Sequence, residues 1–167
     1  MHPLTEAQLR ASFVNATRRE AAQATVPVLD ACDWEHLDFL GWRDRKAPLS
    51  AYVVAEVDER PVGVLLRAAE AGRVRRSAVC AWCEDIVVTD DVTFYVARRG
   101  GAAGRRGDTI GTLLCTEFGC SRNVRRRPTR AEAGTDLAVD REQLVARRIA
   151  GLRERCGRFV AEVLRTR

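Results

Sequence analysis

The sequence predicts an α+β protein in which an N-terminal helical segment, an antiparallel β-sheet and a long C-terminal helix surround a cysteine-rich finger. Apolar residues recur at helical spacing near both ends of the chain, short apolar runs occupy the middle, and two closely spaced cysteine pairs interrupt these runs. Residues 1–45 are expected to form the helical segment and residues 46–167 the remainder, together making one compact domain. With 167 residues, 46% of them hydrophobic, the chain is long enough to bury a real core.

The N-terminal segment carries helix signals in two places. Residues 5–24 predict an amphipathic helix with Thr5 as its N-cap and Gln8 at the capping-box position. A second short helix is expected over residues 34–40, with Asp33 as its N-cap and Gly41 as its terminator, before the loop that leads into the sheet.

Short apolar runs bounded by polar turns predict five β-strands. The first two flank residues 58–61, Asp-Glu-Arg-Pro, which is a hairpin signal. The last two flank residues 98–108, a stretch rich in glycine and arginine that lacks a side chain to pack and is expected to form a mobile hairpin tip. The strands are expected at residues 52–57, 62–66, 74–79, 92–97 and 109–114.

A long C-terminal helix is expected to begin at Asp140, its N-cap, with Gln143 at the capping-box position. Such a helix would carry apolar residues at alternating spacings of four and three. This stripe must be buried either against the sheet of the same chain or, as a coiled-coil seam, against a partner helix; its short length favours the sheet. The stripe consists of Val145, Ile149, Leu152, Cys156, Phe159 and Val163.

Two closely spaced cysteine pairs, Cys80 with Cys83 and Cys115 with Cys120, lie about thirty residues apart. Tight turns aim the two sulfurs of each pair at one point, and the intervening chain brings these points together, as a tetrahedral thiolate site requires. We interpret the four cysteines as ligands of one structural zinc ion. An iron centre, a redox pair formed by Cys80 and Cys83, and unligated thiols remain alternatives. Four protein ligands leave no open coordination position, which argues against metal catalysis.

The termini and the cysteine usage favour a cytoplasmic protein. Residues 1–10 lack the basic and apolar regions of a signal peptide, and no apolar run approaches the roughly 18 residues of a membrane span. Disulfides rarely form in the cytoplasm, which supports the metal interpretation and leaves Cys32 and Cys156 as buried small apolar residues.

The net charge is +5, and Lys46 is the only lysine, so 28 − 1 = 27 of the basic residues are arginine. This excess of arginine over lysine indicates either guanidinium groups that bind phosphate or carboxylate, or merely a genome that favours arginine codons. Two clusters, residues 98–106 and 122–127, flank the metal site in the sequence. A basic face there would suit an acidic protein or an RNA backbone, and a merely solvated face is the alternative. Phe94 and Tyr95 are available to stack on RNA bases, but strand alternation places them on opposite faces.

The acidic residues that follow Cys83 give no indication of catalysis. They lack a histidine, a nucleophile or an open metal position with which to form an acid and base pair. We therefore expect no enzyme activity. The carboxylates concerned are Glu84, Asp85, Asp90 and Asp91.

The order of a cysteine turn, a hairpin, a second cysteine turn and a helix is that of a treble-clef zinc finger. The chain resembles the zinc-binding C-terminal domain of elongation factor G-binding proteins, known from the fusidic-acid-resistance FusB type and also called the FBP domain. Besides the two cysteine pairs, the resemblance rests on Ser-Phe-Val-Asn at 12–15, Trp-Glu-His-Leu-Asp-Phe-Leu-Gly-Trp-Arg-Asp at 34–44, Tyr-Val-Val at 52–54 and Val-Gly-Val-Leu-Leu-Arg at 62–67. It covers nearly the whole chain.

The resemblance implies a non-enzymatic, treble-clef-like zinc protein that docks on elongation factor G or a related translation factor. The four cysteines match the zinc ligands of the family, and the chain is expected to be a monomer. Resistance proteins carry a separate N-terminal helical bundle, whereas about 45 residues precede the first hairpin here, which weakens the expectation of drug resistance. In the family the factor-binding surface is the finger itself, with aromatic and basic residues near the ligand turns and the hairpin. Those places hold Trp82, Phe94, Tyr95, Arg98, Arg99, Arg105, Arg106, Phe118 and Arg122.

Two further functions remain open from the sequence. One is a zinc finger that binds ribosomal or other RNA through the arginine clusters. The other is a thiol redox protein that uses Cys80 and Cys83. Trp82 lies between these two cysteines, so its ring either covers the metal site or contacts a partner.

Overall fold

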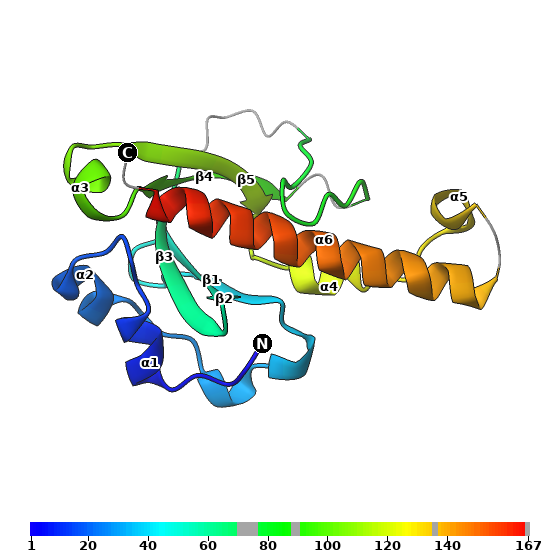
Figure 1. The fold of residues 1–167 in the computed structure, drawn as a ribbon, viewed down its shortest axis with the longest axis horizontal. Helices are drawn as coiled ribbons and strands as arrows, with labels where there is room; N and C mark the ends of the chain where they lie inside the picture. The colour runs from blue at the N-terminus through cyan, green and yellow to red at the C-terminus, as the bar shows by residue number, and fades with distance from the viewer. Residues whose placement is uncertain (70–76, 88–90, 135–136, 166–167) are drawn as a thin grey trace.

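The computed structural model describes residues 1–69, 77–87, 91–134 and 137–165. Within them, one antiparallel sheet has its strands in the order of the sequence, and helices lie on both faces (Figure 1). The α+β fold class predicted from the sequence is therefore confirmed. The strands are β1 (Phe39–Arg43), β2 (Ser50–Val57), β3 (Arg60–Ala68), β4 (Val92–Arg98) and β5 (Thr109–Cys115).

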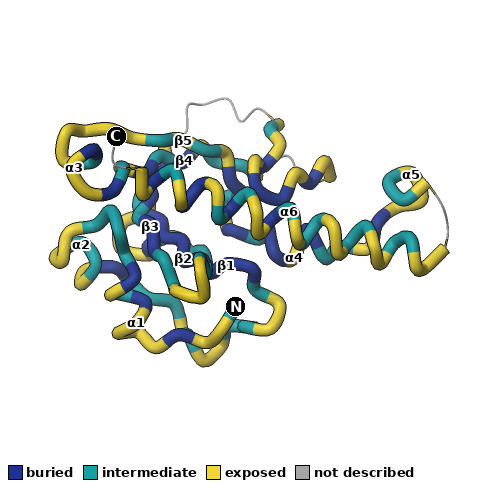
Figure 2. Tube along the Cα trace, in the orientation of Figure 1, coloured by how far each residue is buried: buried dark blue, intermediate teal, exposed yellow. Residues whose placement is uncertain are grey.

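The sheet separates two apolar cores because successive side chains point to opposite faces. On the inner face, Val53 of β2 lies opposite Val64 of β3, and both contact the core that α6 (Ala138–Leu164) covers. On the outer face, Val54 and Leu40 pack against Leu9 of α1 (Glu6–Ala11). Figure 2 shows buried residues concentrated along the strands and the sheet-facing side of α6.

The N-terminal helix expected over residues 5–24 is divided into two, α1 and α2 (Arg18–Gln23). The predicted capping box of Thr5 and Gln8 is present, but a second capping box, formed by Thr17 and Glu20, starts a new helix. Between the helices the backbone pairs with β3, since Val14 N donates to Gly63 O at 2.9 Å and Gly63 N to Ser12 O at 2.9 Å. The second capping box and the pairing with β3 divide the single helix that the periodicity of apolar residues predicted.

The prediction of a short helix over residues 34–40 was wrong. A single 3₁₀ turn, Trp34–His36, is followed directly by β1. Gly41, taken as a helix terminator, lies inside β1. A Cβ atom on Gly41 would lie 2.6 Å from the Cβ of Phe118, so this position needs glycine for the finger to pack on the strand.

The strand expected at residues 74–79 lies mostly outside the described residues, and the described part, residues 77–79, has no regular structure. The expected hairpin tip at residues 98–108 is instead packed. It holds the short helix α3 (Gly101–Arg105), whose Ala103 is fully buried. Gly100 N donates to Val163 O at 2.7 Å, and the Arg99 guanidinium bonds the Glu162 carbonyl, so the tip is attached to the end of α6.

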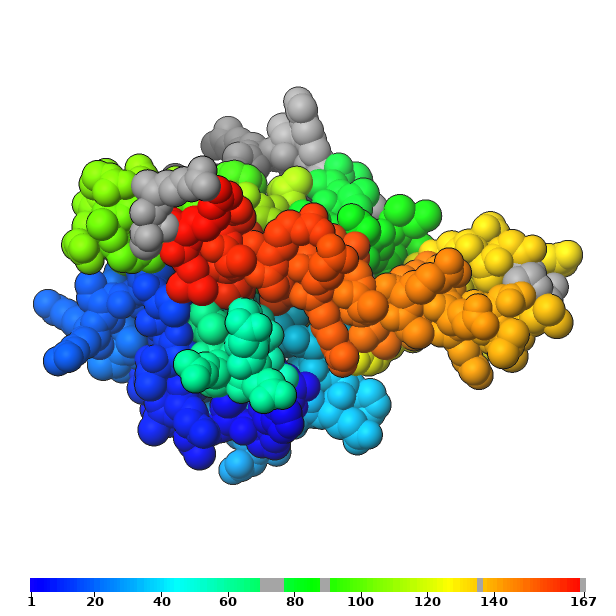
Figure 3. All heavy atoms as spheres, in the orientation of Figure 1, coloured from blue at the N-terminus to red at the C-terminus, as the bar shows by residue number. Residues whose placement is uncertain are grey.

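The apolar stripe of the long C-terminal helix was predicted correctly, but the first residue of the helix was not. α6 begins at Ala138, and Asp140 lies in its first turn without capping it. Leu152, Cys156 and Phe159 are buried in the inner core, so the stripe packs against its own sheet. The first turns of α6, together with α5 (Arg130–Ala133), project from the body of the molecule (Figure 3).

Among the described residues, no helix is both long enough and apolar enough to cross a membrane. Cys156 is buried as expected, and burial raises the pKa of its thiol. Cys32 is only half-buried, which departs from the expectation.

The loop between β1 and β2 is organised by the buried carboxylate of Asp44. Its two oxygens accept hydrogen bonds from Thr25 N (3.0 Å), Lys46 N (2.8 Å), Ala47 N (3.2 Å) and Tyr52 Oη (3.1 Å). Burial by itself would raise the pKa of Asp44, but the backbone hydrogen bonds from Thr25 and Lys46 outweigh it and lower the pKa to about 2.

Replacing Asp44 by alanine is expected to destabilise the protein at neutral pH and much less in acid. A carboxyl whose folded pKa is depressed contributes stability above its unfolded pKa, about 4, and loses it as the pH falls through about 2. We expect a loss of about 1–2 kcal/mol at pH 7 that shrinks between pH ~4 and ~2, measured by urea unfolding. Asp30→Ala, at an exposed site, is the control and is expected to change little at either pH. An equal loss for Asp44→Ala at both pH values would contradict this role.

Candidate metal centre

The four cysteines come from three elements that meet at one end of the β4–β5 hairpin. Cys80 and Cys83 flank a tight turn that is closed by a hydrogen bond from Glu84 N to Cys80 O (2.9 Å). Ala81 N donates to Leu113 O at 2.8 Å, which attaches this turn to β5. Cys115 is the last residue of β5, and Cys120 is the first residue of the short helix α4 (Cys120–Val124).

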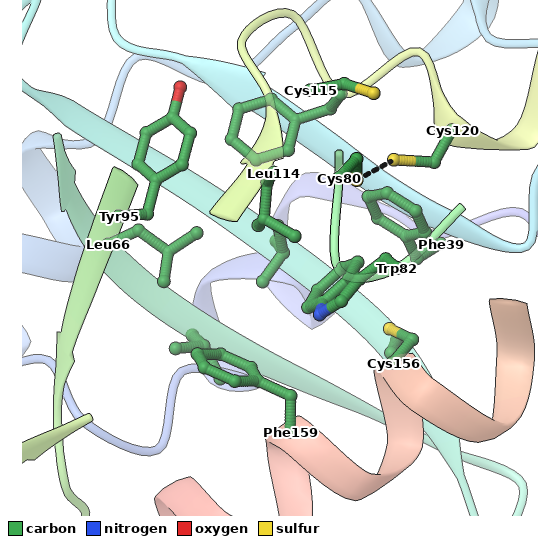
Figure 4. Packing of buried hydrophobic residues seen from close by; sticks show 14 of the residues in the cluster. Phe39, Leu66, Cys80, Trp82, Tyr95, Leu114, Cys115, Cys120, Cys156 and Phe159 are labelled. Atoms are coloured by element: carbon green, nitrogen blue, oxygen red, sulfur yellow. Dashed lines mark hydrogen bonds between the residues drawn. The ribbon is translucent and has the colours of Figure 1, made fainter. Parts of the chain in front are cut away.

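The sulfur atoms of these four cysteines all lie within 4.8 Å of one another, and all four residues are buried. Cys80 Sγ lies 3.6 Å from Cys120 Sγ, and Cys83 Sγ lies 3.6 Å from Cys115 Sγ (Figure 4 labels three of the four). Zinc–sulfur bonds of about 2.3 Å in a tetrahedron require sulfur–sulfur separations of about 3.8 Å. The donor set therefore fits one tetrahedral zinc ion.

The same proximity prevents the four sulfurs from ionising independently. Hydrogen bonds from Cys115 and Cys120 lower the pKa of Cys80, whereas contact with Cys115 and Cys80 raises the pKa of Cys120. A divalent cation removes this conflict, because its charge stabilises every thiolate that it binds.

Comparison with known protein families gives a match to the FBP C-terminal treble-clef zinc-finger family over residues 8–163. The chain belongs to this family. No curated protein and no solved structure matches the chain. The FBP match, together with the four-thiol geometry, identifies one structural zinc ion as the cofactor. The FBP zinc-finger family is a binding-type family, not a known enzyme family.

The FBP finger surrounds its sulfurs with protein. Asn123 of α4 directs Nδ2 toward Cys115 Sγ (3.4 Å) and Cys83 Sγ (3.9 Å), so it can donate to the thiolates. Trp82 is 1% exposed, and its ring packs edge-on against Phe39 at a centroid distance of 4.8 Å. Trp82 therefore belongs to the cover of the centre, as one of the two interpretations from the sequence expected.

Three side chains of the FBP finger that were predicted to contact a partner are buried: Trp82, Tyr95 and Phe118, at 1%, 0% and 7% exposure. Tyr95 Oη donates to Thr116 O at 2.9 Å, and the Phe118 ring lies 5.2 Å from that of Tyr95. Phe94, on the opposite face of β4, is 47% exposed, as strand alternation predicts. The three buried rings support the finger from inside and are not accessible to a partner.

The predicted arginines do not form one basic face. β4 pairs with β5 from Val92 opposite Cys115 to Arg98 opposite Thr109, so the first cluster and the zinc centre lie at opposite ends of this hairpin (Figure 1). At the far end, Arg98 pairs with Glu20 and Arg99 with Glu162. Arg106 pairs with Asp108, and Arg105 is exposed. At the zinc end, Arg122 is exposed in the first turn of α4.

Two arginines after Cys120 stabilise the finger from within, a role that the sequence did not indicate. The side chain of Asp38 is completely buried and pairs with Arg125 (2.5 Å) and Arg153 (2.8 Å), which joins the start of β1 to α4 and α6. Arg126 pairs with Asp85 (3.1 Å) and with Glu132 of α5 (2.7 Å). The run of arginines indicated only a solvated or partner-binding face, because pairing across distant segments leaves no local pattern.

Three of the acidic residues that follow Cys83 have structural contacts, through the side chain or the backbone. Asp85 is the buried partner of Arg126, and Glu84 pairs with Arg155 at 3.0 Å. The Asp91 carbonyl accepts from Thr116 N at 2.9 Å, and Asp90 lies outside the described residues.

Proposed function

We propose that this FBP-family chain is a non-catalytic cytoplasmic adaptor that binds a translation factor, elongation factor G, as a monomer through the face around its zinc finger. The main support is the family match over residues 8–163, because FBP proteins are a binding-type family. The closed thiolate site agrees with a scaffold role, since four sulfur ligands fill the coordination shell of zinc.

The accessible groups at the zinc end suit a protein partner. Ile86 and Val87, just after the first cysteine turn, are 68% and 59% exposed, and Arg122 is exposed beside the second turn. The buried core of a protein interface is more apolar than the rest of the surface, and arginine is enriched there. We define the zinc-end face by these three residues, Ile86, Val87 and Arg122.

RNA binding receives less support. Arg125 and Arg126 are engaged with Asp38 and Asp85, so these guanidinium groups are already neutralised by the chain itself. Tyr95 is buried and unavailable for stacking on bases.

Binding of purified elongation factor G to the zinc-loaded chain tests the proposal. Ile86→Glu and Arg122→Glu are each expected to weaken binding about tenfold or more, because each places a charge of the wrong sign in the zinc-end face. The double variant Arg105→Glu, Arg106→Glu is the control, because it changes more charge at the opposite end of the same hairpin.

Binding should change less than about threefold in this control, allowing for its long-range charge. No binding of the unaltered chain at low salt would reject the proposal. Loss of binding only in the double variant would show that the interface lies at the other end of the hairpin. Steeply salt-dependent RNA binding without affinity for the factor would favour a nucleic-acid-binding finger.

A further inference from the structure

A groove of about 540 Å³ lies on the outer face of the sheet, at the end of β4 remote from the zinc centre. Its walls are α2 and the loop between β1 and β2, and strands β2, β3 and β4 form its floor. A volume of this size is typical of small-molecule sites. Its lining includes Asp44, Lys46, Tyr52, Leu65, Arg67 and Val96.

The floor of the groove is apolar and fixed in place. Leu65 and Val96 contribute aliphatic side chains, and Tyr52 contributes its ring. The ring of Trp42 stacks on Tyr52 at a centroid distance of 5.0 Å and an interplanar angle of 24°, and the Tyr52 hydroxyl donates a hydrogen bond to the Asp44 carboxylate. A flat apolar group entering the groove therefore meets a preformed surface.

The acidic groups of the groove are already engaged. Asp44 accepts hydrogen bonds from four donors, so its carboxylate has little capacity left for a ligand. Glu20 binds Arg98 through both carboxylate oxygens, at 2.6 and 2.8 Å. A cationic ligand would find no free carboxylate here.

Two cations remain. Across the described part of the chain, neither the Lys46 ammonium nor the Arg67 guanidinium has a hydrogen-bond or ion-pair partner. Arg67 lies opposite Ser50 in the β2–β3 pairing, and Ser50 N donates to Ala47 O at 2.7 Å. Arg67 and the loop that carries Lys46 thus flank the same end of the groove.

We infer that this groove binds a small organic anion that carries a flat apolar body. The carboxylate or phosphate of the ligand lies between Lys46 and Arg67, where charge-assisted hydrogen bonds hold it. The body of the ligand rests on Tyr52, Leu65 and Val96. This site is separate from the zinc-end face and does not depend on the proposed function.

Fluorescence titration with 8-anilinonaphthalene-1-sulfonate, a flat organic anion, tests the site in the full zinc-loaded chain. Its uncharged analogue, N-phenyl-1-naphthylamine, is the matched ligand control. Lys46→Gln with Arg67→Gln is expected to weaken binding of the anion about tenfold or more, and that of the neutral analogue less than about twofold. Arg45→Gln, which removes an adjacent exposed cation that does not line the groove, is the matched variant and should have little effect.

Amide chemical-shift changes on adding the anion should concentrate at Ser50, Leu65 and Val96. Competition with benzoate and with adenosine monophosphate then distinguishes a carboxylate ligand from a phosphate ligand. Unchanged anion binding in the double variant, or shift changes elsewhere in the chain, would overturn the inference. If the double variant lost affinity for the anion and for the neutral analogue to the same extent, the two cations would shape the groove without binding the anion. This result would also overturn the inference.

Discussion

Replacing Cys80 by serine is expected to release the zinc ion and unfold the finger. The four cysteines belong to the same buried core as side chains of β2, β3 and α6, and the metal joins the Cys80–Cys83 turn to β5 and α4. The apparent binding energy of structural zinc in small fingers is about 10–16 kcal/mol, which is comparable to the ~5–15 kcal/mol stability of a typical domain. We expect the thermal midpoint to fall by at least about 10 °C, with substoichiometric zinc.

Cys32→Ser is the matched control, because the same substitution is made at a half-buried cysteine outside the cluster. It should retain one zinc ion and shift the midpoint by only a few degrees. A strong chelator should reproduce the effect of Cys80→Ser in the unaltered chain. An unchanged midpoint after complete removal of zinc would show that the metal is not structural.

Trp82→Ala is also expected to have a large effect, on both the stability of the protein and the rate of zinc release. The indole is buried between Phe39 and Phe159, with centroid distances of 4.8 and 5.6 Å, and its removal leaves a cavity beside the cysteines. Substitutions of this kind cost about 3–5 kcal/mol. We also expect faster release of zinc to a chelator, because water gains access to the thiolates. Urea unfolding and the rate of zinc transfer measure the two effects.

Trp82→Phe should recover part of the stability, since an aromatic ring still fills the space between Phe39 and Phe159. Trp34→Ala removes the same side chain at a half-buried position and should cost less. If Trp82→Ala left stability and zinc release unchanged but abolished binding of elongation factor G, Trp82 would be a partner contact and not the cover of the centre.

The parts of the fold with a regular local pattern were predictable. The four-three stripe of α6 anticipated the burial of Leu152, Cys156 and Phe159, and the spacing of the cysteines anticipated the thiolate cluster. Both patterns arise because a fixed periodicity or a tight turn determines where neighbouring side chains point.

The parts that depend on distant partners were not predictable. Residues 39–43 form a strand because they pair with β2, whereas the local sequence with a cap and a glycine favours a helix. The pairs of Asp38 with Arg125 and Arg153 join residues more than 80 positions apart in the sequence. For the same reason, the arginines after Cys120 were interpreted as a surface although two of them hold the finger together.

The most direct test is zinc X-ray absorption spectroscopy on the full chain, combined with metal analysis. We predict one zinc ion per chain, coordinated by four sulfur atoms at about 2.3 Å. Substoichiometric zinc, or a coordination shell containing nitrogen, oxygen or fewer than four sulfurs, would contradict a centre formed by Cys80, Cys83, Cys115 and Cys120.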